Sequence, residues 1–296
     1  MSEIELNKDK KKSNGENVVE LQTEILDYEP DGYKTREKKA VNKPVIIITI
    51  CVLVLVAAAA VFGWMYNSGA FVHEADGKCG VNLTWHLDKE GHLTIKGTGT
   101  IDGKVESHWK RYSARIKSVS IPEGVTAIGA DAFSGCRNMT AVNIPDSVME
   151  IGNRAFYNCR SLQKADLPDG IIKIGESAFE KCPALKSIEL PESITSLAKN
   201  VFCGCEALEK IKLPENITVI PRRAFANCAS LQEITLSSST ESIGYGAFMG
   251  CASLASLTLP DTIKSISNNA FEKCTALGTL ELPSGIKEIN AETFAG

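Results

Sequence analysis

The heptapeptide ADAFSGC (130–136) decides the fold of this chain, because close copies of it return every 23 residues. The copies are NRAFYNC (153–159), ESAFEKC (176–182), KNVFCGC (199–205), RRAFANC (222–228), YGAFMGC (245–251) and NNAFEKC (268–274). Complete 23-residue units begin at Ile121, Ile144, Leu167, Leu190, Leu213, Leu236 and Leu259, and a truncated eighth begins at Leu282. Such a strict period is the signature of a solenoid, in which each unit packs only on its neighbours.

Each unit carries a strand signal followed by a helical one. Ala165 and Leu167 alternate with Asp166, as expected of a short strand with one buried face. Pro168 then ends the strand, because proline has no N–H to donate. The AF-x-x-C run has helical spacing, and Gly or Asn precedes the cysteine in five of seven units, which suits the left-handed residue that ends a helical turn. We therefore expect strand, corner, strand-like segment and short helix in every unit.

The 120 residues before the repeats divide into four parts by composition. Residues 1–44 hold nine basic and ten acidic side chains with no Phe or Trp, which predicts a disordered segment. Residues 45–65 carry no charge and, as a helix, would be about 31 Å long, enough to span a membrane. Residues 66–78 are a linker. Leu83, Trp85 and Leu87 alternate ahead of a DKEG turn, so 79–120 predicts a β-hairpin cap over the first repeat.

The membrane segment favours one orientation. Five Lys or Arg residues lie within 34–43, and the first carboxylate after the span is Glu74. The positive-inside rule then places the N-terminus in the cytoplasm and residues 66–296 outside the cell. A cleaved signal peptide is the competing interpretation, although the 44 residues before the apolar run exceed the usual length of its charged region.

The repeat pattern L-P-x-x-I-x-x-I-G-x-x-A-F-x-x-C-x-x-L resembles the leucine-rich repeats of the BspA-like family of microbial surface proteins, and 79–103 resembles that family's entry module. The resemblance covers about residues 79–296. It implies a leucine-rich repeat solenoid: a right-handed, β-rich α/β superhelix with short helical turns, which the 45–65 helix would anchor. It also implies display at a cell surface, a role in adhesion or in host and interspecies contact, and no enzymatic activity or cofactor.

The repeated cysteines are the first candidates for chemistry. At one phase of a solenoid they form a column on the inward Phe–Leu face, which makes them small core residues: Cys136, Cys159, Cys182, Cys205, Cys228, Cys251 and Cys274. Disulfides are the rival interpretation outside the cell, but parallel side chains do not turn toward each other and an odd column leaves one unpaired. Cys203 shares its column with Tyr157, Glu180 and Met249, so we expect an outward, exposed thiol there.

Catalytic and metal sites find little support in the pattern. All four histidines, His73, His86, His92 and His108, precede the repeats, and none shares a column with a cysteine or serine. We therefore expect no Cys–His or Ser–His pair. A metal site in the cap from Cys79, His86, His92 and His108 remains an alternative to solvent-facing side chains. Beyond residue 44 the chain holds 23 basic and 26 acidic side chains, which argues against nucleic acid as a partner.

The remaining candidate is the outward face of the strands. Its side chains lie at regular intervals, as solenoids use them to bind extended partners: Asn143, Asp166, Glu189, Lys212, Thr235, Thr258 and Glu281, beside Lys164 and Lys210. An ordinary solvated face explains the same residues. The sequence thus predicts a single-pass surface protein that binds an extracellular protein or glycan. The alternative is a structural spacer or scaffold with no ligand of its own, acting through the cytoplasmic tail.

Overall fold

The computed structural model describes residues 54–59, 73–103, 109–286, 288–290 and 292–296. The chain divides into two compact units, 1–64 and 65–296, and residues 54–59 of the first are helical. The expected disordered segment 1–44, most of the expected membrane helix 45–65 and most of the linker 66–78 lie outside the described residues. Within the described residues, no helix combines the length and apolar character needed to cross a membrane.

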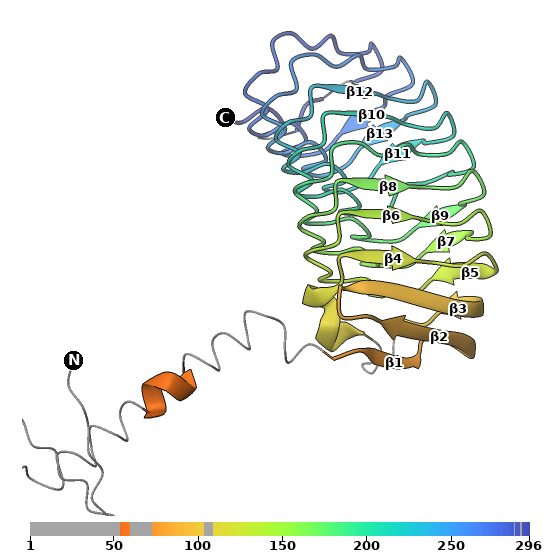
Figure 1. Ribbon diagram of the computed structural model, residues 1–296. Coiled ribbons are helices and arrows are strands. Elements are labelled where there is room, and N and C mark those ends of the chain that lie inside the picture. Colours follow the sequence, from red (N-terminus) through yellow and green to blue (C-terminus); the bar gives the residue numbers. More distant parts are fainter. Residues whose placement is uncertain (1–53, 60–72, 104–108, 287, 291) are drawn as a thin grey trace, which may run out of the picture. The chain divides into compact units, whose positions relative to one another are not determined.

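The second unit is a β-solenoid whose successive turns, here called rungs, stack into one curved column above an N-terminal cap (Figure 1). The cap contains β1 (Ala75–Lys78), β2 (Asn82–Leu87) and β3 (His92–Ile101), which pair antiparallel in that order. The hairpin of β2 and β3 is the one that the alternation of Leu83, Trp85 and Leu87 predicts. A 3-10 helix, η1 (Lys110–Arg115), leads from the cap into the repeats.

Two columns of short strands run along the solenoid. The first strand column contains β4 (Ser118–Ser120), β6 (Ala141–Asn143), β8 (Lys164–Asp166), β10 (Lys210–Lys212) and β12 (Glu233–Thr235). The second contains β5 (Val125–Ile128), β7 (Glu150–Ile151), β9 (Lys173–Ile174), β11 (Val219–Ile220), β13 (Ser242–Ile243) and β14 (Ser265–Ile266). Pairing between rungs is parallel and in register, so that Ala165 lies beside Val142 and Ile174 beside Ile151.

The core fills the space between the two strand columns and a third side, the corner, which the AF-x-x-C segments form. A single stack of aromatic rings runs along the corner from Trp109 and Phe133 through every repeat phenylalanine to Phe294, with neighbouring centroids 5.2–5.8 Å apart. Trp85 of the cap meets Trp109 edge-on at 5.9 Å. The cap therefore continues the core of the repeats and closes its first rung.

In the residues that the structure describes, the corner forms no α-helix, contrary to the expectation of a short helix in each unit. It contains successive tight turns, such as the bonds from the Ser134 amide to the Asp131 carbonyl and from the Cys136 amide to the Phe133 carbonyl. Two residues in every rung have left-handed backbone, and such residues interrupt a right-handed helix. One column is the expected position before the cysteine. The other, with φ between 54° and 59°, was not expected: Asp131, Arg154, Ser177, Asn200, Arg223, Gly246, Asn269 and Glu292.

This left-handed backbone lets the corner make a hydrogen-bond ladder of its own between rungs. The amides of Asp131, Phe133 and Gly135 donate to carbonyls of the next rung at 2.8–2.9 Å. The same three-bond pattern returns in later rungs, through Phe179 and Phe202 to the bonds of Phe271 and Lys273. These bonds between rungs, the corner ladder, pair the backbone N–H and C=O groups that a helix would otherwise pair.

Rungs also touch backbone to backbone at the glycine that follows the second strand column. A Cβ atom built on Gly152 would lie 2.6 Å from the backbone nitrogen of Ala130, and one on Gly175 would lie 2.5 Å from that of Asn153. No real Cβ atom approaches another atom so closely. The column of these positions is Gly129, Gly152, Gly175, Ala198, Pro221, Gly244, Ser267 and Asn290.

Candidate ligand-binding face

The candidate face is the outward side of the first strand column. In β8, Lys164 and Asp166 are exposed and point away from the core, while Ala165 between them is buried. The same pattern holds in β6, β10 and β12, and the residues at 189, 258 and 281 are exposed as well. All nine side chains that the sequence indicates are therefore solvent-facing, at a regular spacing set by the parallel register.

Most charges on this face have a partner on the same face or beside it. Lys164 contacts both carboxylate oxygens of Asp166, at 2.8 and 3.1 Å. Lys210 pairs with Glu233 at 3.1 Å across adjacent rungs, and Lys212 approaches Glu192 at 3.7 Å. These pairs are more than half exposed, so each adds little stability. The face therefore carries mixed, locally balanced charge and no extended field of one sign.

The candidate face continues onto the cap. The 23-residue pattern does not predict this continuation. Strand register places His86 beside Thr94, and Thr94 beside Ser120, and Ser120 occupies in β4 the position of Asn143 in β6. The outward side chains of the hairpin thus lie in register with those of β4, the first strand of the first strand column, although β4 and β6 are not paired with each other. At this end the row is uncharged apart from Asp76, which pairs with His86 at 2.7 Å.

His92 in the cap contacts two serines, contrary to the expectation that no histidine meets a serine. Its Nδ1 lies 2.7 Å from the Ser118 Oγ and its Nε2 lies 2.9 Å from the Ser120 Oγ. The parallel pairing of β3 with β4 brings them together, and the repeat pattern does not encode that register. Both serines are exposed, and among the described residues no carboxylate contacts the imidazole. The arrangement therefore supplies hydrogen-bonding groups to the candidate face.

The column cysteines lie inside the solenoid, where all seven are buried and have free thiols. Six of them, from Cys159 to Cys274, donate a hydrogen bond from Sγ to the carbonyl of the phenylalanine one rung earlier, at 3.1–3.2 Å. Burial raises the pKa of Cys136 to about 12 and that of Cys274 to about 11. Their thiols stay protonated near neutral pH and are poor nucleophiles.

Cys203 is buried, and the expectation of an exposed thiol at this position is wrong. Its side chain is 6 % exposed, and its column is half-buried at most other rungs, for example at Tyr157 and Glu180. Burial raises the pKa of Cys203, and the neighbouring Arg223 and Lys181 oppose that shift. The corner packs rung on rung, so neighbouring rungs cover the side chains of this column although they face outward.

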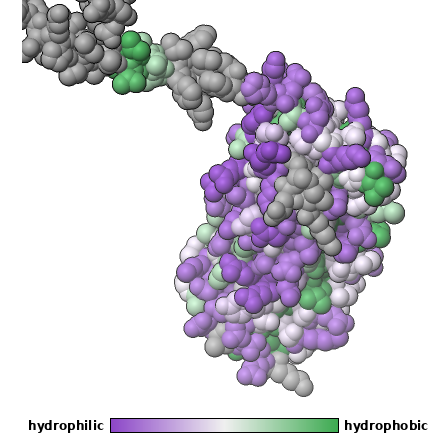
Figure 2. All heavy atoms as spheres, turned by 90° about the horizontal axis from the view of Figure 1, so that it is seen from below, coloured by the Kyte–Doolittle hydropathy of each residue, from purple (hydrophilic) through white to green (hydrophobic). Residues whose placement is uncertain are grey.

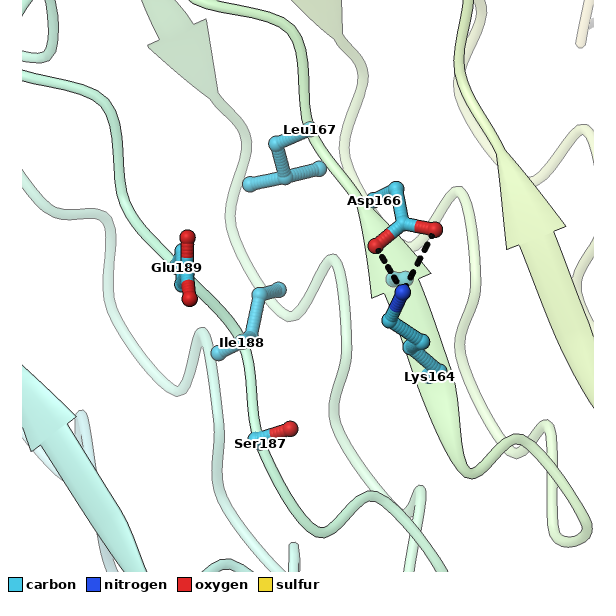
Figure 3. A pocket seen from close by; sticks show the side chains of 7 residues that line it. Lys164, Asp166, Leu167, Ser187, Ile188 and Glu189 are labelled. Carbon is cyan, nitrogen blue, oxygen red and sulfur yellow. Dashed lines mark hydrogen bonds and ion pairs between the residues drawn. The ribbon is translucent and has the colours of Figure 1, made fainter.

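Seen from below, the solenoid and its cap carry mainly hydrophilic residues, with hydrophobic residues in small separate patches (Figure 2). A shallow slot on the candidate face lies between β8 and residues 187–189, lined by Lys164, Ala165, Asp166, Leu167, Ser187, Ile188 and Glu189 (Figure 3). Among the described residues, no group of three or more His, Cys, Asp or Glu side chains is placed to hold a metal ion.

Comparisons with known proteins agree with this geometry. The family model for the BspA type leucine rich repeat region matches residues 108–232 and 195–296, with six copies. A leucine-rich repeat protein from Bacteroides ovatus is 34 % identical, with a TM-score of 0.55 over 69 % of this chain, and this chain spans only 53 % of it. A leucine-rich repeat protein from T. pallidum is 27 % identical, with a TM-score of 0.52 over 68 % of this chain and 91 % of its own. No curated protein matches the sequence.

Proposed function

This chain belongs to the family of BspA-type leucine-rich repeat proteins, and from that premise we propose that it is a non-catalytic binding protein of the cell surface. Residues 45–65 anchor it in the membrane with the N-terminus in the cytoplasm. The repeats then lie outside the cell, where the candidate face binds a protein or glycan partner in adhesion or in contact between cells.

One observation carries the proposal: the exposed side chains of the candidate face lie in regular rows along the solenoid. Parallel register stacks Asn143 on Asp166 and Lys212 on Thr235, and the row extends onto the cap at Ser120 and Thr94. Ordered strands hold these side chains in place before a ligand arrives, which lowers the entropy cost of binding. The mixed charges and hydroxyls suit a polar, extended partner and do not suit a polyanion.

A structural spacer is the second candidate, and the ion pairs within the face favour it. Lys164 with Asp166 and Lys210 with Glu233 satisfy each other without a ligand. A ligand that used these groups would first have to break the pairs. If the protein is a spacer, reversing the charges of this face should change no binding affinity.

The test is direct binding of the purified full chain to a panel of extracellular-matrix proteins and to a glycan array. For each ligand found, the triple variant Asp166→Lys, Glu189→Lys, Lys212→Glu is compared with the unaltered chain. We expect the triple variant to lose at least tenfold in affinity, because the three reversals replace attraction by repulsion along one row.

The matched control reverses charges on the second strand column, in the variant Lys173→Glu, Lys264→Glu. These side chains are as exposed as those of the candidate face, at 64 % and 69 %, and pair with Glu150 and Glu241. The control should change affinity less than twofold. Absence of any ligand in the panel, or equal losses in both variants, would count against the candidate face.

A further inference from the structure

Residues 187–198 interrupt both strand columns in the middle of the solenoid. The first column is also unpaired between β4 and β6 and has no strand beyond β12. At 187–189 an isolated bridge from Lys164 to Ser187 joins the column to the rung before it. In the second, the structure describes all of 195–198 and shows no backbone hydrogen bond from these residues to β9 or to β11. The second column is continuous from β3 through β9 and again from β11 through β14, so this gap divides it in two.

The corner ladder, in contrast, passes through the gap intact. The Phe179 amide donates to the Val201 carbonyl at 3.0 Å, and the Phe202 amide donates to the Ala224 carbonyl at 2.9 Å. Neighbouring rungs therefore keep their full set of backbone bonds at the corner. On the strand side, the links that remain include the Lys164–Ser187 bridge, the bond from the Ser193 hydroxyl to the Ile171 carbonyl, and the bond from the Glu215 amide to the Glu192 carboxylate. The buried Ala165 and Ile188 keep the core closed beneath the slot of Figure 3.

The ring stack shows that the rungs are also farther apart here. Phe202 lies 5.8 Å from Phe179 and 5.7 Å from Phe225, with rings tilted by 16° and 17°. The other neighbouring phenylalanine pairs in the stack are 5.2–5.6 Å apart, with tilts of 4–11°. The wider spacing and larger tilt of the rings at Phe202 are a second observation, independent of the strand pairing, that the rungs separate at this place.

The sequence supplies a physical cause in the glycine column. Elsewhere its amide donates to the rung before, as Gly175 does to Ile151 and Gly244 does to Ile220, both at 2.8 Å. Pro221 has no N–H and cannot make this bond. Ala198 adds a Cβ at a position where the glycines of the neighbouring rungs touch backbone. Ser267 also has a Cβ yet keeps its bond to Ile243 at 2.9 Å, so a Cβ alone does not open the ladder. We attribute the gap to Ala198 together with Pro221.

We propose that residues 187–198 form a joint between two stiff blocks of the solenoid, with the corner ladder as the pivot and the strand side as the part that opens. The N-terminal block includes the cap and the rungs through β9, and the C-terminal block begins at β10. Asp166, Glu189 and Lys212 lie across the joint, so its opening changes their spacing on the candidate face. The joint exists whether or not that face binds a ligand.

Hydrogen exchange of the full chain, followed by mass spectrometry, tests the joint. Amides that lack a ladder bond exchange through small local openings, whereas ladder amides need larger ones. We expect amides at 195–198 to exchange at least tenfold faster than those at 172–175 and 241–244, the same positions in rungs with intact ladders. The double variant Ala198→Gly, Pro221→Gly should slow the exchange at 195–198 at least tenfold.

The matched control is Ser267→Gly, in the same column on a rung that keeps its ladder bond. It should leave exchange at 195–198 unchanged. Protection at 195–198 equal to that at 172–175 would overturn the proposal, as would unchanged exchange in a folded double variant. If the double variant does not fold, the comparison of segments within the unaltered chain decides the question alone.

Discussion

The Sγ of Cys159 donates a hydrogen bond to the carbonyl oxygen of Phe133, one rung earlier, at 3.2 Å. The same carbonyl already accepts the amide of Cys136 within its own turn. A cysteine at this position is therefore small enough for the core and also supplies a weak donor between rungs. This pairing explains why one residue type recurs where alanine or valine would fill similar space.

The first prediction concerns this contact. Cys228→Ala removes the sulfur and its bond to the Phe202 carbonyl, and we expect a loss of about 1–2 kcal/mol in the free energy of unfolding. Denaturant titration measures the loss. Cys274→Ala is the matched control, because its side chain is 8 % exposed near the last described rung and leaves a smaller cavity. An equal or larger loss at Cys274 would contradict the packing argument.

The second prediction concerns thiol reactivity. Burial raises the pKa of Cys136 to about 12 and also raises that of Cys203, so neither thiol ionises appreciably at pH 8. Alkylation of the native chain at pH 8 should therefore leave the column and Cys203 unmodified, and unfolding in denaturant should expose all of them. Mass spectrometry of peptides identifies the sites. Rapid native labelling of Cys203 would show that it is more open than the structure indicates.

The third prediction concerns the unexpected left-handed column. Ser177 adopts φ 58° without being glycine, whereas Gly246 holds the equivalent position at φ 56°. Ser177→Gly should raise the free energy of unfolding by about 1 kcal/mol, and Gly246→Ala should lower it by a similar amount. A Cβ on Gly246 would lie 3.6 Å from its nearest neighbours, so crowding does not contribute. Shifts of the same sign in both variants would contradict the explanation.

The fourth prediction separates crowding from conformation. Gly152→Ala forces a Cβ to within 2.6 Å of backbone, and we expect it to cost about 2 kcal/mol or more. Gly170→Ala is the control, since its Cβ would lie 3.5 Å from the Asp146 carbonyl, an ordinary contact. Thermal unfolding should show a clear drop in Tm for the first variant and a change of at most a few degrees for the second. Equal changes would mean that the rungs relax freely at the glycine column.

The sequence predicted those parts of the structure that repeat. The period, the inward positions of Phe156 and Leu162, and the alternation in β8 follow from local pattern, because every rung solves the same packing problem. The left-handed backbone at Arg154 could not be predicted, since arginine does not favour it and the bonds to the next rung impose it. The contact of His92 with Ser118 and the burial of Cys203 depend on how one segment lies on another, which a 23-residue pattern does not specify.

The last prediction follows from the joint and uses the aromatic stack. Phe202→Ala removes a fully buried ring at the place where the strand columns are already open, at a cost of about 3–5 kcal/mol. Because stability in a solenoid is a sum of rung and interface terms, weakening its weakest interface should uncouple the two blocks. In a Trp64→Phe background, tryptophan fluorescence comes from Trp85 and Trp109 and reports the N-terminal block, and circular dichroism reports both blocks. We expect two separate urea transitions by these probes in Phe202→Ala.

The matched control is Phe156→Ala, whose rung keeps its second-column ladder bonds. In this variant the fluorescence and the circular dichroism should still change together. Coincident transitions in Phe202→Ala would mean that the interface at the joint is as strong as the others.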